Sequence, residues 1–102
     1  MVICDFCSLP APAWRYPVLD IDHRAPDGRV LFTSVGDWLA CDPCHMLIET
    51  NSMPELAQRA IDRWNLINYP KTTQLGKAVV AGFHERFVQH RRGPAIALEV
   101  VA

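Results

Sequence analysis

The chain has 102 residues, of which 50% are hydrophobic and 21% are charged, and its formal net charge at pH 7 is −1. This length suits one domain, or one domain with a helical extension, and the apolar content is sufficient for a core. The small net charge provides no general attraction to nucleic acid, and no apolar run approaches the ~20 residues that a membrane span requires.

Two C-x-x-C pairs are the strongest signal in the chain: Cys4 with Cys7, and Cys41 with Cys44. Two such turns supply four thiolates, which is typical of a closed tetrahedral zinc site with Zn–S bonds of about 2.3 Å. A redox dithiol and two disulfides are the alternatives. We expect structural zinc in a cytoplasmic protein, because thiols stay reduced there and the N-terminus leads directly into Cys4 without room for a signal peptide.

The segment between the cysteine pairs predicts a β-hairpin. Residues 14–22 and 29–35 flank Ala25-Pro26-Asp27-Gly28, a sequence that favours a turn. Residues 45–49 then continue without a helix breaker, which places Cys44 in the first turn of a short helix. A knuckle, a hairpin and a helix that carries the last ligand form a treble-clef or zinc-ribbon-like module over residues 1–53.

Residues 54–102 predict a helical hairpin followed by a short strand or tail. Ser52 lies three residues before Glu55, and Pro54 follows Ser52 closely, so a helix is expected over 54–67. A second helix is expected over 73–92, with Thr72 or Thr73 as its N-cap. Arg91 and Arg92 would lie in its last turn before Gly93-Pro94, and the apolar residues 95–102 would form a strand or a docked tail.

The predicted fold class is therefore α+β, with a module at 1–53 and a helical hairpin at 54–102. The two parts differ in charge. Residues 1–53 carry three Arg and seven Asp or Glu, whereas residues 54–102 carry seven Lys or Arg and four Asp or Glu.

Three further residues suggest a catalytic site. Asp22 and His23 lie on the expected hairpin, and His45 directly follows Cys44. This order of motifs resembles the zinc-stabilised HNH endonucleases over residues 4–50. The resemblance implies that His23 is a general base and that Asp22 and His45 bind a catalytic divalent metal. The central Asn of that family is replaced by Gly36, which cannot orient a base. We therefore expect Asp22 and His23 to form a polar hairpin tip and His45 to be a surface residue of the helix.

A second resemblance rests on Cys4-Asp5-Phe6-Cys7 and on the segment from Gly36-Asp37-Trp38 to Cys44-His45. Both are similar to small uncharacterised actinobacterial and phage proteins with paired C-x-x-C motifs. This resemblance covers about half of the chain and implies no activity.

Arginines near the end of the second helix are candidate phosphate ligands: Arg86, Arg91 and Arg92, joined by His90 and by Arg59 and Arg63 of the first helix. Cations at a helix C-terminus also complement the helix dipole. We favour the latter interpretation, because exposed aromatic residues are not interleaved with these cations.

We predict a non-enzymatic zinc-binding adaptor or regulatory protein, whose helical half binds a protein partner or a second copy of the chain. The second helix offers an apolar stripe that would need a cover: Leu75, Val79, Phe83 and Phe87. A monomer with a docked tail is the alternative to a homodimer, and any tryptophan left exposed would mark a binding surface. A diverged HNH-type endonuclease is the second hypothesis, and a nucleic-acid-binding zinc ribbon is the third.

Overall fold

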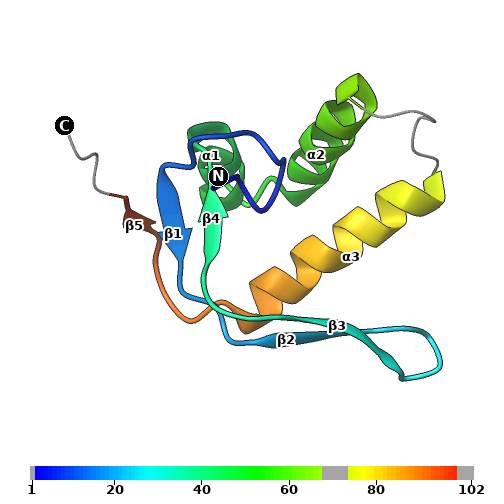
Figure 1. Cartoon of the computed structure of the whole chain (residues 1–102). Coiled ribbons are helices and arrows are strands. Elements are labelled where there is room, and N and C mark those ends of the chain that lie inside the picture. Colours follow the sequence, from blue (N-terminus) through cyan, green and yellow to red (C-terminus); the bar gives the residue numbers. More distant parts are fainter. Residues whose placement is uncertain (1, 68–73, 99–102) are drawn as a thin grey trace.

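The computed structural model describes residues 2–67 and 74–98, which form an α+β fold (Figure 1). Its elements follow in chain order: β1 Trp14–Tyr16, β2 Ile21–Arg24, β3 Val30–Ser34, β4 Trp38–Ala40, α1 Asp42–Glu49, α2 Met53–Ile67, α3 Gln74–His90 and β5 Ile96–Ala97. The cysteine pairs enclose β1 to β4, as the treble-clef arrangement predicts. No helix in the described ranges is long and apolar enough to cross a membrane.

The expected hairpin is confirmed, and it is bent into two parts. β2 pairs with β3, and β1 pairs with β4, both antiparallel. The predicted turn closes β2 and β3, where Gly28 has φ +88° and its N–H donates to the Ala25 carbonyl at 2.9 Å. Between β3 and β4, Gly36 has φ +87°, a conformation that favours glycine. Position 36 therefore serves the bend between the two parts of the hairpin.

The short helix α1 begins directly at the second cysteine pair. Cys41 is its N-cap residue, and Pro43 lies in the first turn, where a missing N–H costs no helical hydrogen bond. The chain leaves α1 through Asn51, which has φ +55°. α2 begins at Met53, directly after Ser52 as predicted, and the Leu56 N–H donates to the Ser52 carbonyl at 3.0 Å.

The helix α3 ends at His90 rather than at Arg92, because the next residues join the N-terminal half. Arg91 forms a β-bridge with Val18, and the Arg92 N–H donates to the Pro17 carbonyl at 2.8 Å. The expected N-cap at Thr72 or Thr73 lies outside the described residues. Figure 1 shows α3 running between α2 and the β2–β3 hairpin.

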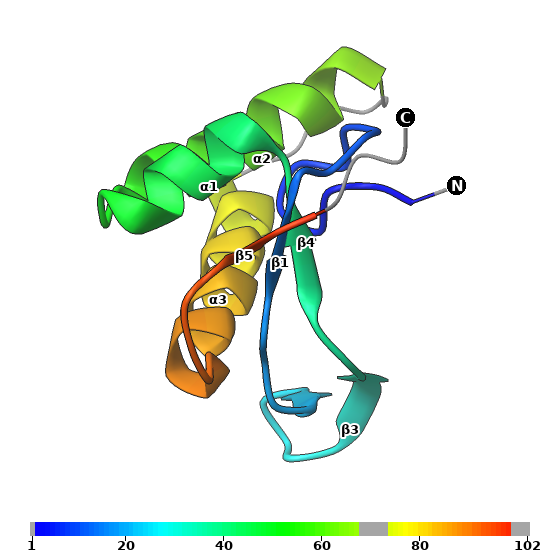
Figure 2. The same cartoon turned by 90° about the vertical axis from the view of Figure 1, so that its left-hand side faces the viewer.

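The predicted C-terminal strand is present over its first residues. β5 pairs antiparallel with β1, with Trp14 opposite Ala97, so that β1 is the central strand of the sheet β4-β1-β5. Figure 2 shows β5 crossing beside β1. Residues 99–102 of the expected tail lie outside the described part.

One core joins the two halves that the sequence distinguishes. Leu56 of α2 and Phe87 of α3 are fully buried. They belong to the same core as Phe6, Tyr16 and Trp38 of the N-terminal half. The Phe87 ring lies 4.9 Å from that of Phe6 and 5.3 Å from those of Tyr16 and Trp38, between ring centroids. The α3 stripe is thus covered at Phe87 by aromatic residues of the same chain.

Candidate metal centre and adjoining cavity

The first cysteine pair lies on a tight N-terminal turn. The Ser8 N–H donates to the Cys4 carbonyl at 2.9 Å, and the Cys4 N–H donates to the Leu9 carbonyl at 2.8 Å. The Phe6 N–H lies 3.4 Å from Cys4 Sγ and donates to it. This turn is a knuckle that directs both thiols to one point and supports the charge of one of them.

The second pair is positioned by the start of α1. Cys41 has an extended conformation with φ −72° and ψ 166°, and Cys44 lies within the first helical turn. The N-terminus of a helix carries a partial positive charge, which favours thiolates over thiols. The local structure thus places Cys41 and Cys44 together at the start of α1.

The four thiols meet in a buried cluster that could hold a metal ion. All four sulfur atoms lie within 4.8 Å of one another, and Cys7 Sγ lies 3.6 Å from Cys41 Sγ. Sulfurs at the corners of a tetrahedron with metal–sulfur bonds of about 2.3 Å are about 3.8 Å apart. A disulfide would need about 2.05 Å, and the four cysteines are free. The spacing therefore fits a tetrahedral ion rather than disulfides.

The electrostatics of the cluster also favour a cation. A hydrogen bond with Cys44 lowers the pKa of Cys4 to about 4, and the same bond is the main cause of the raised pKa of Cys44. Burial raises the pKa of Cys7 to about 11. Four buried thiols without a cation therefore share protons, because several thiolates at this spacing repel one another. A divalent cation removes that repulsion and allows all four sulfurs to bind as thiolates.

Two groups outside the cysteines support the cluster, and the sequence analysis assigned neither this role. Arg59 of α2 directs its Nη2 toward Cys41 Sγ, at 3.8 Å, and a guanidinium there offsets the charge of the thiolates. Asp5 accepts a hydrogen bond from the Leu39 N–H at 2.6 Å, while the Asp5 N–H donates to the Leu39 carbonyl at 2.8 Å. The knuckle is thus fixed to β4, directly before Cys41.

The residues of the endonuclease motif do not converge. The side chains of Asp22 and His23 alternate across β2, with Asp22 exposed and His23 1% exposed. Asp22 accepts from the Thr33 hydroxyl at 2.8 Å and pairs with Arg24 at 3.4 Å. In the described ranges, the four cysteines are the one group of three or more Cys, His, Asp or Glu whose ligand atoms approach closely enough to hold a metal.

Both ring nitrogens of His23 already have neighbours. Nε2 lies 2.7 Å from the Ser34 hydroxyl, and Nδ1 lies 3.5 Å from Arg86 Nη1. Its ring stacks on Phe32 with centroids 4.3 Å apart. Burial, followed by the charge of Arg86, lowers the pKa of His23 below its ordinary value. His23 therefore acts as a neutral packing residue whose orientation is fixed by Ser34.

The third residue of that motif, His45, joins α1 to β1. Its ring stacks on Trp14 with centroids 3.8 Å apart, and its Nδ1 lies 2.7 Å from the Tyr16 hydroxyl. Tyr16 also donates to Glu49 at 2.9 Å. Through these contacts, His45 helps to orient α1, the helix that carries Cys44.

The candidate phosphate-binding arginines engage separate neighbours. Arg86 lies beside His23, as described above. Arg91 pairs with Glu49 at 3.3 Å and lies over the Tyr16 ring at 4.7 Å from its centroid. The side chain of Arg92 is exposed. Arg86 and Arg91 are thus used within the fold.

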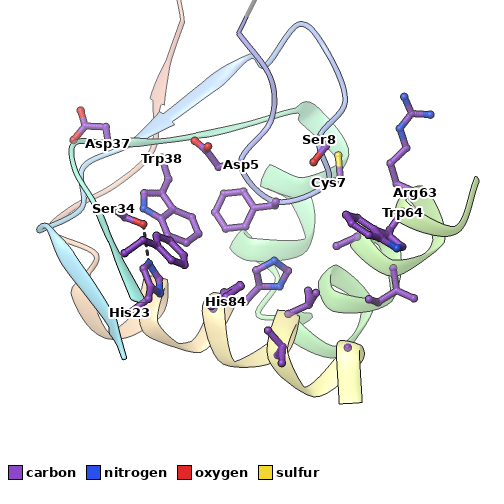
Figure 3. Close-up of a pocket in the computed structure, with 18 of the residues that line it drawn as sticks. Asp5, Cys7, Ser8, His23, Ser34, Asp37, Trp38, Arg63, Trp64 and His84 are labelled. Atoms are coloured by element: carbon purple, nitrogen blue, oxygen red, sulfur yellow. Dashed lines mark hydrogen bonds between the residues drawn. The ribbon is translucent and has the colours of Figure 1, made fainter. Parts of the chain in front are cut away.

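A large apolar cavity lies beside the cysteine cluster, between the knuckle, the β2–β3 hairpin, α2 and α3 (Figure 3). Its volume is about 860 Å³, and four of its lining residues are apolar side chains about half exposed or more: Phe32, Val35, Trp64 and Val79. Any tryptophan left exposed was expected to mark a binding surface, and Trp64 is 52% exposed. The cavity itself is formed by segments distant in sequence, and no local motif indicates it.

His84 of α3 contributes a polar group to this cavity. It is 4% exposed, and its Nδ1 has no hydrogen-bond partner among the described residues. Burial lowers the pKa of His84 to about 4, although the charge of Cys4 and a hydrogen bond with the Phe6 backbone act to raise it. A neutral imidazole with one unpaired nitrogen therefore lines the cavity.

No protein-family model, curated protein or solved structure matches this chain. The fold and the site alone define its class: an α+β protein with a buried four-cysteine cluster that could hold a metal ion in its N-terminal half. The similarity to uncharacterised C-x-x-C proteins remains a prediction.

Proposed function

We propose that this chain is a zinc-binding adaptor or regulatory protein that acts through protein–protein interaction. The observation that carries this proposal is the apolar cavity, whose rim exposes Phe32, Trp64 and Val79 beside a buried cysteine cluster. Exposed aromatic side chains around a hollow are typical of interfaces rather than of free surfaces.

In this proposal the metal is zinc, and its role is structural. The ligands would be Cys4, Cys7, Cys41 and Cys44, and four cysteines are the usual ligand set of closed structural zinc sites. Such a site leaves no coordination position for water. The ion would hold the knuckle against α1, and thereby hold one wall of the cavity in place. Metal analysis of the purified, reduced protein should give one zinc per chain, and Cys41→Ser should lose it. Protein whose four thiols react freely without a chelator would contradict the zinc assignment.

The adaptor role is tested by photo-crosslinking from the cavity rim. Val79 is 47% exposed and lines the cavity, whereas Val88 on the same helix is 50% exposed and does not. A photoreactive residue at position 79 should give a discrete protein adduct in the cells that produce this protein, and one at position 88 should not. Purified chain run in parallel identifies an adduct between two copies. Equal adducts from both positions, or none from position 79, would overturn the proposal.

A further inference from the structure

The polar groups that line the cavity are almost all satisfied by their own neighbours. His23 and Ser34 bond each other, Asp37 pairs with Arg15 at 2.6 Å, and Asp5 accepts from Leu39. Arg63 Nε has no partner among the described residues, but Figure 3 shows that side chain directed away from His84. Of the buried groups in this lining, His84 Nδ1 is the one that can act as an acceptor and has no partner among the described residues; a ligand would reach it after a shift of the neighbouring side chains.

The neighbours of His84 indicate what that nitrogen can do. Its ring packs against the Phe6 ring, with centroids 5.5 Å apart, and burial lowers its pKa, so that the ring is neutral. A neutral imidazole has one N–H and one lone pair, and the tautomer protonated at Nε2 has its lone pair at Nδ1, the nitrogen without a partner among the described residues. A buried acceptor without a donor carries a desolvation cost, and a ligand that donates to it removes that cost.

The walls around this acceptor suit an aromatic ring. Aromatic side chains line the cavity from several sides: Phe6, Phe32, Trp38, Trp64 and Phe83. Figure 3 shows His84 projecting from α3 between His23 on one side and Trp64 on the other. Aromatic rings favour edge-to-face and offset contacts with one another. A cavity of about 860 Å³ accommodates an aromatic ring together with the chain that carries it.

We propose that this cavity binds an aromatic group that carries an N–H or O–H donor, such as an indole, and that His84 Nδ1 accepts its hydrogen bond. The inference deepens the proposed adaptor function, because the same face would receive the aromatic side chain of a partner. The donor can also come from a free aromatic metabolite. The binding preference of the cavity is therefore tested with small ligands, without any partner protein.

The test compares ligands that differ only in the donor. Zinc-loaded protein is titrated with two pairs of ligands: indole and 1-methylindole, and N-acetyltryptophanamide and its 1-methyl analogue. The NMR resonances of the histidine ring nitrogens and of the backbone amides are followed during each titration. The N–H ligands should bind about tenfold more tightly than their methylated forms, which corresponds to one buried hydrogen bond. The His84 Nδ1 resonance should shift with the N–H ligands alone. Preference for the tryptophan amide indicates a peptide source, and preference for indole indicates a free ligand.

Variants complete the design. His84→Phe keeps a ring and removes the acceptor, so both members of each ligand pair should bind equally. Val79→Glu should abolish binding, while Val88→Glu, at a similar exposure outside the cavity, should leave it unchanged. If His84→Phe does not fold, the Nδ1 resonance of the unmodified protein decides. Equal binding of N–H and N-methyl ligands, no binding at all, or an unmoved Nδ1 resonance would overturn the inference. If one of these results were obtained while position 79 still gave the crosslink, the aromatic-ligand inference would fail and the adaptor function would be retained.

Discussion

The imidazole of His45 lies flat on the indole of Trp14, with ring centroids 3.8 Å apart and ring planes 9° apart. Trp14 also donates from Nε1 to Asp42 at 2.8 Å, so β1 contacts both the first residue of α1 and the residue after Cys44. This pair fixes the ligand-bearing helix against the sheet. The histidine that suggested a catalytic metal ligand thus contributes to the geometry of the cysteine cluster.

Replacing His45 by Ala should lower the free energy of unfolding by about 1–3 kcal/mol, from the lost stacking and the lost contact with Tyr16. Zinc stoichiometry should not change, because no cysteine is touched. Urea unfolding of the zinc-loaded protein measures the effect. Met46→Ala, at a neighbouring residue that is 59% exposed, is the control and should change stability by less than about 0.5 kcal/mol. Loss of zinc in His45→Ala would contradict a purely packing role.

Replacing Arg59 by Gln should weaken zinc binding, because the guanidinium that faces Cys41 Sγ at 3.8 Å offsets the thiolate charge. Groups around the ligands of metal sites are worth about 10–100-fold in affinity. Competition with a chelator of known affinity gives the ratio. Gln58→Ala on the exposed side of α2 is the matched control. Equal zinc affinity of Arg59→Gln and the unmodified protein would show that the contact has no electrostatic role.

Stability should fall as the pH decreases below the ordinary pKa of histidine, in part because of His23. Burial and Arg86 lower its pKa below 6.5 in the folded chain, so the unfolded chain binds more protons in that range. Between about pH 7.5 and about pH 6.0, the loss of unfolding free energy should be smaller in His23→Gln, which keeps a hydrogen-bonding group for Ser34. Denaturation at both pH values, with bound zinc measured at each, provides the comparison. An unchanged pH dependence in this variant would show that His23 does not titrate differently on folding.

Phe87 and Val88 offer a direct comparison of two neighbouring residues on α3, one fully buried and one 50% exposed. Phe87→Ala should cost about 3–5 kcal/mol, because it opens a cavity among Phe6, Tyr16 and Trp38. Val88→Ala should remain within about 0.5 kcal/mol. Thermal unfolding of both variants decides whether the helical half contributes to the core of the N-terminal half. Similar effects of the two changes would place the α3 stripe outside the core.

The extent of sequence-based prediction follows the range of each interaction. The cysteine cluster, the turn at residues 25–28 and the start of α2 depend on short motifs, and each was predictable. The expected polar hairpin tip at Asp22 and His23 was wrong, because both residues lie within β2 and His23 faces the buried side of that strand. Phe87 illustrates what could not be predicted. Its stripe indicated a buried face, but its cover comes from Phe6 and Tyr16, which are distant in sequence and belong to no shared motif.

The cavity and His84 are further examples of long-range structure. A histidine on a helix is ordinary in composition, and its unpaired nitrogen results from the packing of α3 against the knuckle. Likewise, Ser34 contacts His23 only because β2 and β3 pair in one particular register. In the sequence, Gly36 was notable because it stands where the endonuclease motif has an asparagine. In the fold, Gly36 forms a bend with positive φ. Such roles depend on the assembled tertiary structure.

The pairing of β5 with β1 has a consequence for biosynthesis. All four cysteines precede α2, α3 and β5 in the chain, so they leave the ribosome before Phe87 and β5 are added to the core and the sheet. Chains fold from the N-terminus as they emerge, and an ion can order a segment that lacks a complete core. Zinc captured on the ribosome would therefore hold the nascent knuckle and hairpin until their C-terminal covering arrives. In a cell starved of zinc, newly made chains would present Phe6 and Tyr16 to chaperones and proteases before the rest of the molecule exists.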